Sequence, residues 1–247
     1  MAGNIFQLVL LYIVTYLVAS IPTAYIMGKW IKNIDIRQQG SGNVGGSNVF
    51  YSIGKFWILP LFFIDVILKG SIPLLILIYM FEMQLNSLHF IYIPFVAMFA
   101  HNWSPWLKFT GGRGISIAIG SMLIIAPLHL GIFTLISVGG WLFFRSSGVW
   151  VLIALVLLLL ISIFYPIEVV NNRFWPIDSA QSNVILGFFI GLIMITLFKR
   201  LFANWEKPYK RIAIRNLVWN RIVYDRDMKY WKSWVHRKST QKGENDL

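Results

Sequence analysis

Cysteine is absent from this 247-residue chain, and acidic residues are scarce. Without cysteine the chain can form neither a disulfide nor a nucleophilic thiolate. The ten Asp and Glu residues and the four His residues do not cluster at the spacing of metal ligands. The sequence therefore predicts no metal site.

Charged residues of both signs are also few, at 13% of the chain, whereas soluble domains carry about a quarter. Hydrophobic residues make up 57%. This composition predicts an all-α integral membrane protein. The net charge of +12 would suggest nucleic acid binding in a soluble protein. In a membrane protein it marks the cytoplasmic side, which faces anionic lipid, and no nucleic acid partner is predicted.

Seven hydrophobic stretches predict seven transmembrane helices, because about 20 apolar residues cross a bilayer; the fourth stretch is shorter. The first stretch has no Lys or Arg before residue 29, unlike the basic start of a signal peptide, so we expect an uncleaved span. The stretches cover roughly residues 5–27, 56–81, 88–100, 115–125, 128–144, 149–165 and 184–198.

The distribution of Lys and Arg predicts the orientation. With the N-terminus outside and the C-terminus cytoplasmic, 20 of the 22 basic residues lie at the cytoplasmic face. Four flank a glycine-rich loop at residues 39–48, two flank a second loop at 110–114, one is Arg145 and thirteen lie from Lys199 to the end of the chain. This excess is the pattern of cytoplasmic loops, so both glycine loops are expected inside.

The two glycine-rich loops are the strongest functional signal. Residues 39–48 read Q-G-S-G-N-V-G-G-S-N, and residues 110–114, after His101, read T-G-G-R-G. Loops of this kind can turn successive backbone N–H groups toward one point and so bind an anion. A following helix N-terminus adds to the attraction. Two such loops in one membrane protein predict chemistry on phosphorylated substrates.

Two charges lie inside the second stretch. Asp65 and Lys69 are four residues apart, on one face of a helix. Charges at membrane depth usually face the protein interior or a polar cavity. Two interpretations stay open, a structural ion pair and a role in supporting a site.

The chain divides into a polytopic membrane domain, residues 1–202, and a basic, aromatic tail, residues 203–247. The tail intersperses Trp and Tyr among Arg and Lys. This pattern is typical of an amphipathic helix on anionic lipid. Docking of a partner protein through the tail is the alternative.

Three segments resemble one family. Residues 41–49, S-G-N-V-G-G-S-N-V, resemble the S-G-N-x-G-A-T-N-V motif of the bacterial acyl-phosphate:glycerol-3-phosphate acyltransferases, the PlsY family. Residues 63–70, F-I-D-V-I-L-K-G, look like that family's F-D-V-x-K-G segment with one residue inserted between Val and Lys. Residues 101–114 are similar to its second motif, G-H-x-x-P-x-x-x-x-F-x-G-G-K-G. The resemblance covers roughly residues 10–202.

The resemblance implies a multi-pass enzyme of the bacterial inner membrane without metal or cofactor. Such enzymes transfer an acyl group from acyl phosphate to glycerol 3-phosphate in phospholipid synthesis and release lysophosphatidic acid and phosphate. Two phosphate head groups match two anion-binding loops, and the acyl chain would lie among the apolar helices. Acyl phosphate is already activated, so the protein needs mainly to orient its substrates and stabilise an oxyanion.

The resemblance also implies site residues. Ser41 and His101 are the expected catalytic residues. The expected substrate- and phosphate-binding residues are Gly42, Asn43, Gly45, Asn48, Lys69, Gly111, Gly112, Arg113 and Gly114.

Each of these residues also has a purely structural interpretation. The glycines would then allow tight turns or close helix packing. Ser41, Asn43 and Asn48 would cap helices. His101 would form a hydrogen bond at the membrane surface, and Arg113 would anchor a lipid head group.

Several positions depart from the family pattern. Tyr51 stands where the first motif ends in Arg, Arg113 replaces a Lys, and Ser104 replaces a Pro. The third motif, R-H-x-E-N-x-x-R-L, is reduced to Arg200 and Leu201. The expectation is therefore an acyltransferase with an eroded site. The alternative is an inactive relative that serves as a structural or lipid-binding subunit of a larger membrane complex. A transporter is a third possibility, but the broken-helix inverted repeats such folds often show are not seen.

Overall fold

The computed structural model describes residues 5–39, 42–144, 146–164, 182–202 and 213–226. The described residues form helices and connecting loops, and an isolated β-bridge joins Ser104 and Thr110. The α-helices are α1 (Ile5–Ser20), α2 (Thr23–Lys32), α3 (Gly46–Ser52), α4 (Ile58–Phe62), α5 (Ile72–Tyr79), α6 (His89–Asn102), α7 (Ile115–Ile125), α8 (Pro127–Phe144), α9 (Ser147–Phe164), α11 (Ser182–Leu201) and α12 (Ile214–Tyr224). A π-helix, η3 (Phe63–Ser71), joins α4 to α5, and short 3₁₀ helices lie at η1 (Ile36–Gln38), η2 (Lys55–Trp57) and η4 (Pro105–Leu107).

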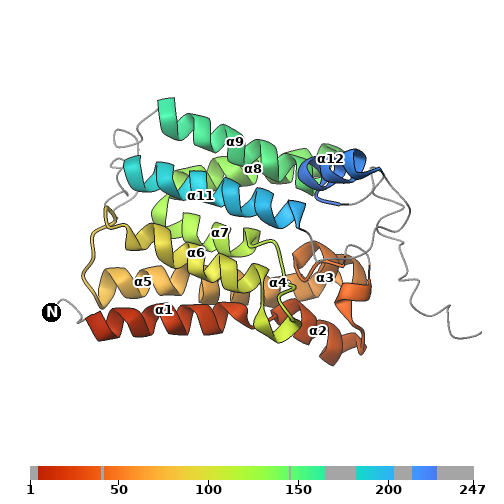
Figure 1. Ribbon diagram of the computed structural model, residues 1–247, viewed down its shortest axis with the longest axis horizontal. Helices are drawn as coiled ribbons and strands as arrows, with labels where there is room; N and C mark the ends of the chain where they lie inside the picture. Colours follow the sequence, from red (N-terminus) through yellow and green to blue (C-terminus); the bar gives the residue numbers. More distant parts are fainter. Residues whose placement is uncertain (1–4, 40–41, 145, 165–181, 203–212, 227–247) are drawn as a thin grey trace, which may run out of the picture.

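The long helices lie side by side as a bundle (Figure 1). α7 packs between η3, α6 and α8, while α11 packs against α6 and α9. Five helical segments among the described residues are long and apolar enough to cross a membrane: Ile5–Lys32, Lys55–Tyr79, Pro127–Phe144, Ser147–Phe164 and Asn183–Leu201. The prediction of an all-helical membrane protein is thereby confirmed.

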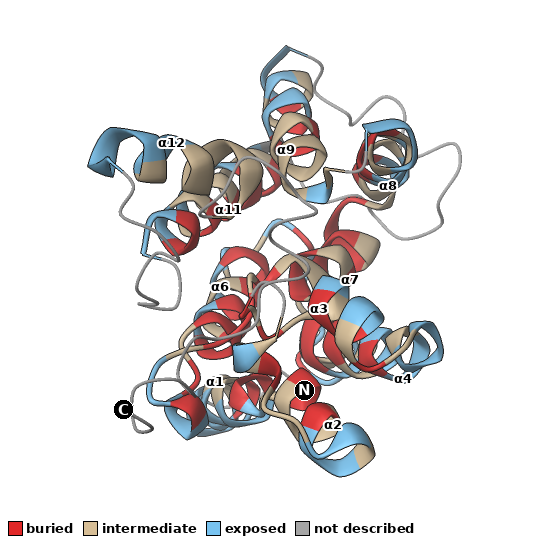
Figure 2. Ribbon diagram, turned by 90° about the vertical axis from the view of Figure 1, so that its right-hand side faces the viewer, coloured by how far each residue is buried: buried red, intermediate tan, exposed pale blue. Residues whose placement is uncertain are grey.

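The burial pattern fits a lipid environment. Buried residues face the centre of the bundle, and exposed ones lie on the outward faces (Figure 2). Large apolar side chains such as Leu59, Leu135 and Phe143 are largely exposed on those outward faces. An apolar outer surface of this extent is typical of a membrane-facing protein.

The first hydrophobic stretch, expected to be one span over residues 5–27, contains a break. α1 ends at Ser20 and α2 begins at Thr23. Pro22 lacks a backbone N–H, and its ring disfavours a helical conformation at Ile21. The carbonyl groups of Ser20 and Ile21 are therefore available to other parts of the chain.

The second stretch contains the π-helix η3. Its backbone closes with the bond from the Ile72 N–H to the Ile67 carbonyl, five residues apart. The sequence comparison with the family pattern placed one extra residue between Val66 and Lys69. A π-helix takes up one residue more per turn than an α-helix and often lies at a functional site. The extra residue that the resemblance implies would be accommodated by this π geometry without interrupting the span.

η3 and α7 approach each other through glycines. A Cβ at Gly120 would lie 2.0 Å from the Val66 carbonyl oxygen, and the Cα atoms of Gly70 and Gly120 face each other directly. The Ser71 hydroxyl donates to the Gly120 carbonyl at 2.8 Å. Small residues at a helix contact allow such close packing within a membrane.

A small second core lies beneath the first glycine loop. Val44, the only apolar residue in the loop over residues 39–48, is buried with Ile36 and Val49. This contact anchors the loop to α2, η1 and α3.

Candidate functional site

The two glycine loops lie at the same end of the bundle, beside α2, α3 and the end of α6 (Figure 1). They also touch, because a Cβ at Gly112 would lie 2.9 Å from the Val44 carbonyl oxygen. The structure thus brings together segments that are about seventy residues apart in the sequence. The sequence predicts that residues 41–48, His101 and residues 111–114 converge on one phosphate-binding pocket; the loops meet at Val44 and Gly112, and the shared pocket stays a prediction.

Asn48 shapes the first loop. Its side-chain Nδ2 donates to the carbonyl groups of Ile36 (2.8 Å), Gln39 (3.0 Å) and Asn43 (3.0 Å). Its Oδ1 accepts from the Ser52 hydroxyl at 3.1 Å. Asn48 is buried, so these bonds fix the loop backbone around its side chain. Direct binding of substrate by Asn48 stays a prediction.

The other predicted residues of this loop are only partly described. Gly42 donates its N–H to the Gln39 carbonyl at 2.8 Å, and Gly45 immediately precedes α3. Asn43 lines a cavity beside the loop. Ser41, the expected catalytic serine, lies outside the described residues.

The second loop lies directly on His101. The Gly112 N–H donates to the His101 carbonyl at 3.1 Å, and a Cβ at Gly112 would lie 2.0 Å from His101 Nε2. A Cβ at Gly111 would lie 2.3 Å from the same carbonyl oxygen. Gly114 has a φ of 73°, in the left-handed region that favours glycine. The close approach of the second loop to His101 therefore requires glycine at residues 111 and 112, whether or not the loop binds a ligand.

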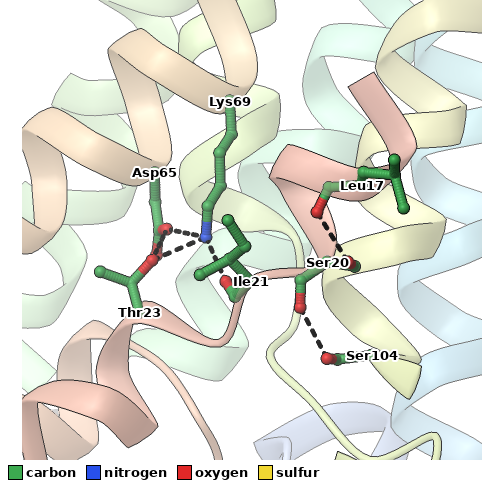
Figure 3. A network of polar contacts seen from close by, with 7 residues as sticks. All are labelled: Leu17, Ser20, Ile21, Thr23, Asp65, Lys69 and Ser104. Atoms are coloured by element: carbon green, nitrogen blue, oxygen red, sulfur yellow. Dashed lines mark hydrogen bonds and ion pairs between the residues drawn. The ribbon is translucent and has the colours of Figure 1, made fainter. Parts of the chain in front are cut away.

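Ser104, one of the departures from the family pattern, connects this region to the break after α1. Its hydroxyl donates to the Ser20 carbonyl at 2.6 Å (Figure 3). The indole N–H of Trp106 donates to the Ser20 hydroxyl at 3.0 Å. A proline at residue 104 could not form the first of these bonds, so the departure has a structural use.

Asp65 and Lys69 form a buried ion pair at 2.7 Å, as their spacing predicted (Figure 3). The Lys69 ammonium also donates to Thr23 Oγ1 and to the Ile21 carbonyl, both at 2.7 Å. An ammonium has three N–H donors, and these three bonds occupy them. The arrangement is the structural ion pair given above as one interpretation. Phosphate binding by Lys69 stays a prediction, and it would require one of the three bonds to open.

The end of α11 adds two cations, Lys199 and Arg200, that were not among the expected site residues. Lys199 and Arg200 are buried, and Lys199 Nζ donates to the Asn102 carbonyl at 2.5 Å. Lys199 also lies over the Trp103 ring, 5.0 Å from its centre. Arg113 Nη1 donates to the Lys199 carbonyl at 3.2 Å and pairs with Asp225 at 3.0 Å. The structure thus joins the second loop, α11 and the end of α12.

A cavity of about 530 Å³ lies beside these elements. Apolar side chains form much of its wall, among them Ile119, Phe133, Trp141 and Val151. Polar lining groups come from Asn43 and Ser47 at the first loop, from Tyr51 on α3, from Ser146 and Ser147 at the start of α9, and from residues 224–226. His101 and the second loop do not line the cavity, but Ile115, at the start of α7, does. Its lining suits an amphiphile with an apolar chain and a polar head.

Comparison with known proteins identifies close similarity over most of the chain. The family model described as glycerol-3-phosphate acyltransferase matches residues 9–207. Glycerol-3-phosphate acyltransferase 4 of Dehalococcoides mccartyi strain CBDB1 is 33% identical over 226 residues, which cover 91% of each chain. Glycerol-3-phosphate acyltransferase 5 of Dehalococcoides mccartyi strain ATCC BAA-2266 is 31% identical over 239 residues, which cover 96% of each chain.

A solved structure agrees in fold. The crystal structure of PlsY (YgiH), an integral membrane glycerol 3-phosphate acyltransferase in its glycerol 3-phosphate form, superposes with a TM-score of 0.64 and 25% identity. The superposition covers 78% of this chain and 87% of that one. The lysophosphatidic acid form of the same protein superposes with a TM-score of 0.63.

Proposed function

Because the chain belongs to the glycerol-3-phosphate acyltransferase family, we propose that it transfers an acyl group from acyl phosphate to glycerol 3-phosphate at the junction of its two glycine loops. The products are lysophosphatidic acid and phosphate. The chain is accordingly a membrane acyltransferase of phospholipid synthesis. Neither the comparisons nor the described residues favour the inactive-subunit alternative.

The observation that carries the site assignment is the contact between the loops at Val44 and Gly112, next to a largely apolar cavity. Glycine-rich loops of this kind can bind a phosphate through backbone N–H groups, and the cavity offers a wall suited to an acyl chain. Substrate enters such a site from the membrane with its head group toward the loops. Arg113, which belongs to the second loop and contacts α11, supports the assignment because guanidinium groups bind phosphate by paired hydrogen bonds.

The reaction needs orientation more than a strong nucleophile. The glycerol 3-phosphate hydroxyl oxygen forms a bond to the acyl carbonyl carbon, and the bond from that carbon to the phosphate oxygen breaks. The hydroxyl proton moves to the departing phosphate or to a neighbouring base. We propose Ser41 and His101 as the protein groups at this step, and Gly42, Asn43, Gly45 and residues 111–114 as phosphate-binding groups. Fixed N–H donors that stabilise the developing oxyanion typically contribute on the order of 10²–10³ in rate.

The test is product formation by the purified full chain in lipid vesicles. With a long-chain acyl phosphate and radiolabelled glycerol 3-phosphate, we expect labelled lysophosphatidic acid and an equal amount of phosphate. A parallel reaction with acyl coenzyme A as donor tests the donor chemistry, and one without acceptor measures hydrolysis alone. Labelled product from acyl coenzyme A but not from acyl phosphate would contradict the assigned donor, and no product from either would contradict the function.

We propose seven spans, an outside N-terminus and a cytoplasmic C-terminus, in a bacterial inner membrane. The basic asymmetry supports this orientation, as does the position of both loops at one end of the bundle (Figure 1). Ser47→Cys in the first loop should resist a membrane-impermeant thiol reagent in intact cells. Ser87→Cys, in the link between α5 and α6 at the opposite end, should react. Labelling of Ser47→Cys from outside would contradict the topology.

The division at residue 202 into a membrane domain and a tail also stays a proposal. Its support is that the family model ends at residue 207. Attachment of the tail to anionic lipid is consistent with the exposed Trp219 and Ile214 on α12. Docking of a partner protein gains no support from the described residues.

A further inference from the structure

The end of α12 returns to the membrane domain. Arg200 Nη1 donates to the Ile222 carbonyl at 2.6 Å, and its Nη2 donates to the Gly148 carbonyl at 2.7 Å. A Cβ at Gly148 would lie 2.7 Å from the Tyr224 carbonyl oxygen, so α9 begins in direct contact with this turn. Asp225 follows in a left-handed conformation, with a φ of 57°, and ends the helix. These contacts hold the segment over residues 224–226 against the bundle.

This segment forms part of the cavity wall. Tyr224, Asp225 and Arg226 line the cavity together with Asn43 and Tyr51. α3 and α12 both lie at the end of the bundle that carries the glycine loops (Figure 1). The segment also lies beyond residue 207, where the family model ends. A part of the chain beyond the family model therefore lines the cavity.

The charges around the segment are unbalanced. Three arginines, Arg113, Arg200 and Arg226, lie around one carboxylate, Asp225, so this basic cluster has a net charge of +2. Asp225 Oδ1 lies 3.0 Å from Arg113 Nη1 and 3.8 Å from Arg200 Nε. Cations removed from water are costly unless a counter-charge or hydrogen bonds compensate them. An anion of two charges bound at the cavity would offset this excess.

We propose that Arg226 is a further phosphate-binding residue of the acyltransferase, and that it holds the phosphate group of acyl phosphate at the cavity. This inference rests on the proposed function. Arg226 lines a cavity whose wall is largely apolar, and an acyl phosphate combines an apolar chain with a charged head group in one molecule. Glycerol 3-phosphate has no apolar chain that could pack against such a wall. Asp225 is a positioning residue in this arrangement, because its carboxylate joins the segment to Arg113.

The experiment compares Arg226→Gln with Arg215→Gln in the full chain. Arg215 lies on α12, which leads into the segment that carries Arg226, but it is exposed and does not line the cavity. We expect Arg226→Gln to raise the KM for acyl phosphate roughly ten- to a hundredfold, since a hydrogen bond to a charged group is lost. The KM for glycerol 3-phosphate should be unchanged, and Arg215→Gln should behave as the wild type. Arg226→Lys should raise the KM for acyl phosphate less than Arg226→Gln does, because lysine keeps the positive charge although it lacks the paired donors of a guanidinium.

Tyr51 offers a second variant that lines the same cavity. Tyr51→Arg in the Arg226→Gln background should recover part of the affinity for acyl phosphate. A general loss of folding would not be repaired by this second change. Recovery therefore separates a charge effect from a structural one.

A binding measurement is independent of turnover. A long-chain alkyl phosphate, which has no acyl group to transfer, should protect the wild type and Arg215→Gln from thermal unfolding more than it protects Arg226→Gln. Equal protection of all three proteins, or an equal KM for acyl phosphate in the two variants, would overturn the inference. A raised KM for glycerol 3-phosphate alone would overturn the assignment to acyl phosphate. Absence of product from the wild type would instead refute the proposed function, and the protection measurement would still decide the role of Arg226.

Discussion

Replacing Asp65 with asparagine should destabilise the protein strongly. The change removes the counter-charge of the Lys69 ammonium, which is 2.7 Å away and almost completely buried. It also weakens the bond from the Thr23 hydroxyl, which donates to the same carboxylate oxygen at 3.0 Å. Loss of one partner from a buried ion pair costs about 3–5 kcal/mol, because the other charge remains without compensation.

The magnitude converts into a measurable shift. For a chain of this length, 1 kcal/mol corresponds to roughly 2–4 °C in the unfolding midpoint, so Asp65→Asn should lower the midpoint by about 6–20 °C. Thermal unfolding of the purified protein in detergent, followed by fluorescence at a fixed heating rate, measures this change. The fixed rate matters because unfolding of membrane proteins is often irreversible.

Two further variants test the reasoning. Asp35→Asn removes a carboxylate from a partly exposed pair with Arg37, and should lower the midpoint by less than about 4 °C. The double variant Asp65→Leu with Lys69→Met removes both buried charges, and should be more stable than Asp65→Leu alone. If Asp65→Asn shifts the midpoint no more than Asp35→Asn does, the network around Lys69 does not stabilise the fold as described.

Two other predictions use matched controls. Gly120→Ala places a methyl group 2.0 Å from the Val66 carbonyl oxygen and should lower the free energy of unfolding by about 1–3 kcal/mol. The control is Gly131→Ala in α8, whose methyl group meets nothing within 4 Å and should be neutral or stabilising. Thermal unfolding compares the two variants. Asn48→Ala removes the hydrogen bonds to three carbonyl groups around the first loop and should lower the acyltransferase rate at least about tenfold. The control Asn86→Ala, in an exposed link, should leave the rate unchanged. Equal rates for the two variants would show that Asn48 does not shape the site.

The sequence predicted the helices well where hydrophobicity alone decides them. The stretches expected at 115–125 and 128–144 agree with α7 and α8 to within one residue. The break at Pro22 and the π-helix around Asp65 were not predicted. Both are deviations of a few residues inside long apolar runs, and they leave the hydrophobic pattern almost unchanged.

The site could be predicted only in part. The glycines of both loops and the pairing of Asp65 with Lys69 follow from local spacing. The contact of Val44 with Gly112 depends on how distant helices pack, and no local pattern encodes it. Lys199 was counted among the basic residues that follow the last apolar stretch, because a basic residue in that position usually marks the membrane surface. Its burial results from the packing of α11 against α6, where the Asn102 carbonyl accepts a hydrogen bond from the Lys199 ammonium.

The acyltransferase rate of Gly112→Ala tests most directly whether the two glycine loops form the site. A methyl group there would lie 2.0 Å from His101 Nε2 and 2.9 Å from the Val44 carbonyl oxygen, so the loops must separate. Gly139→Ala, where nothing lies within 4 Å, is the control. The measurement is the initial rate of lysophosphatidic acid formation from acyl phosphate and glycerol 3-phosphate in vesicles. We predict that Gly112→Ala is about 100-fold slower than the wild type, since small misplacements of reacting groups cost that much, and that Gly139→Ala is unaffected. Equal rates for all three proteins would contradict the assignment of the site to the loop junction.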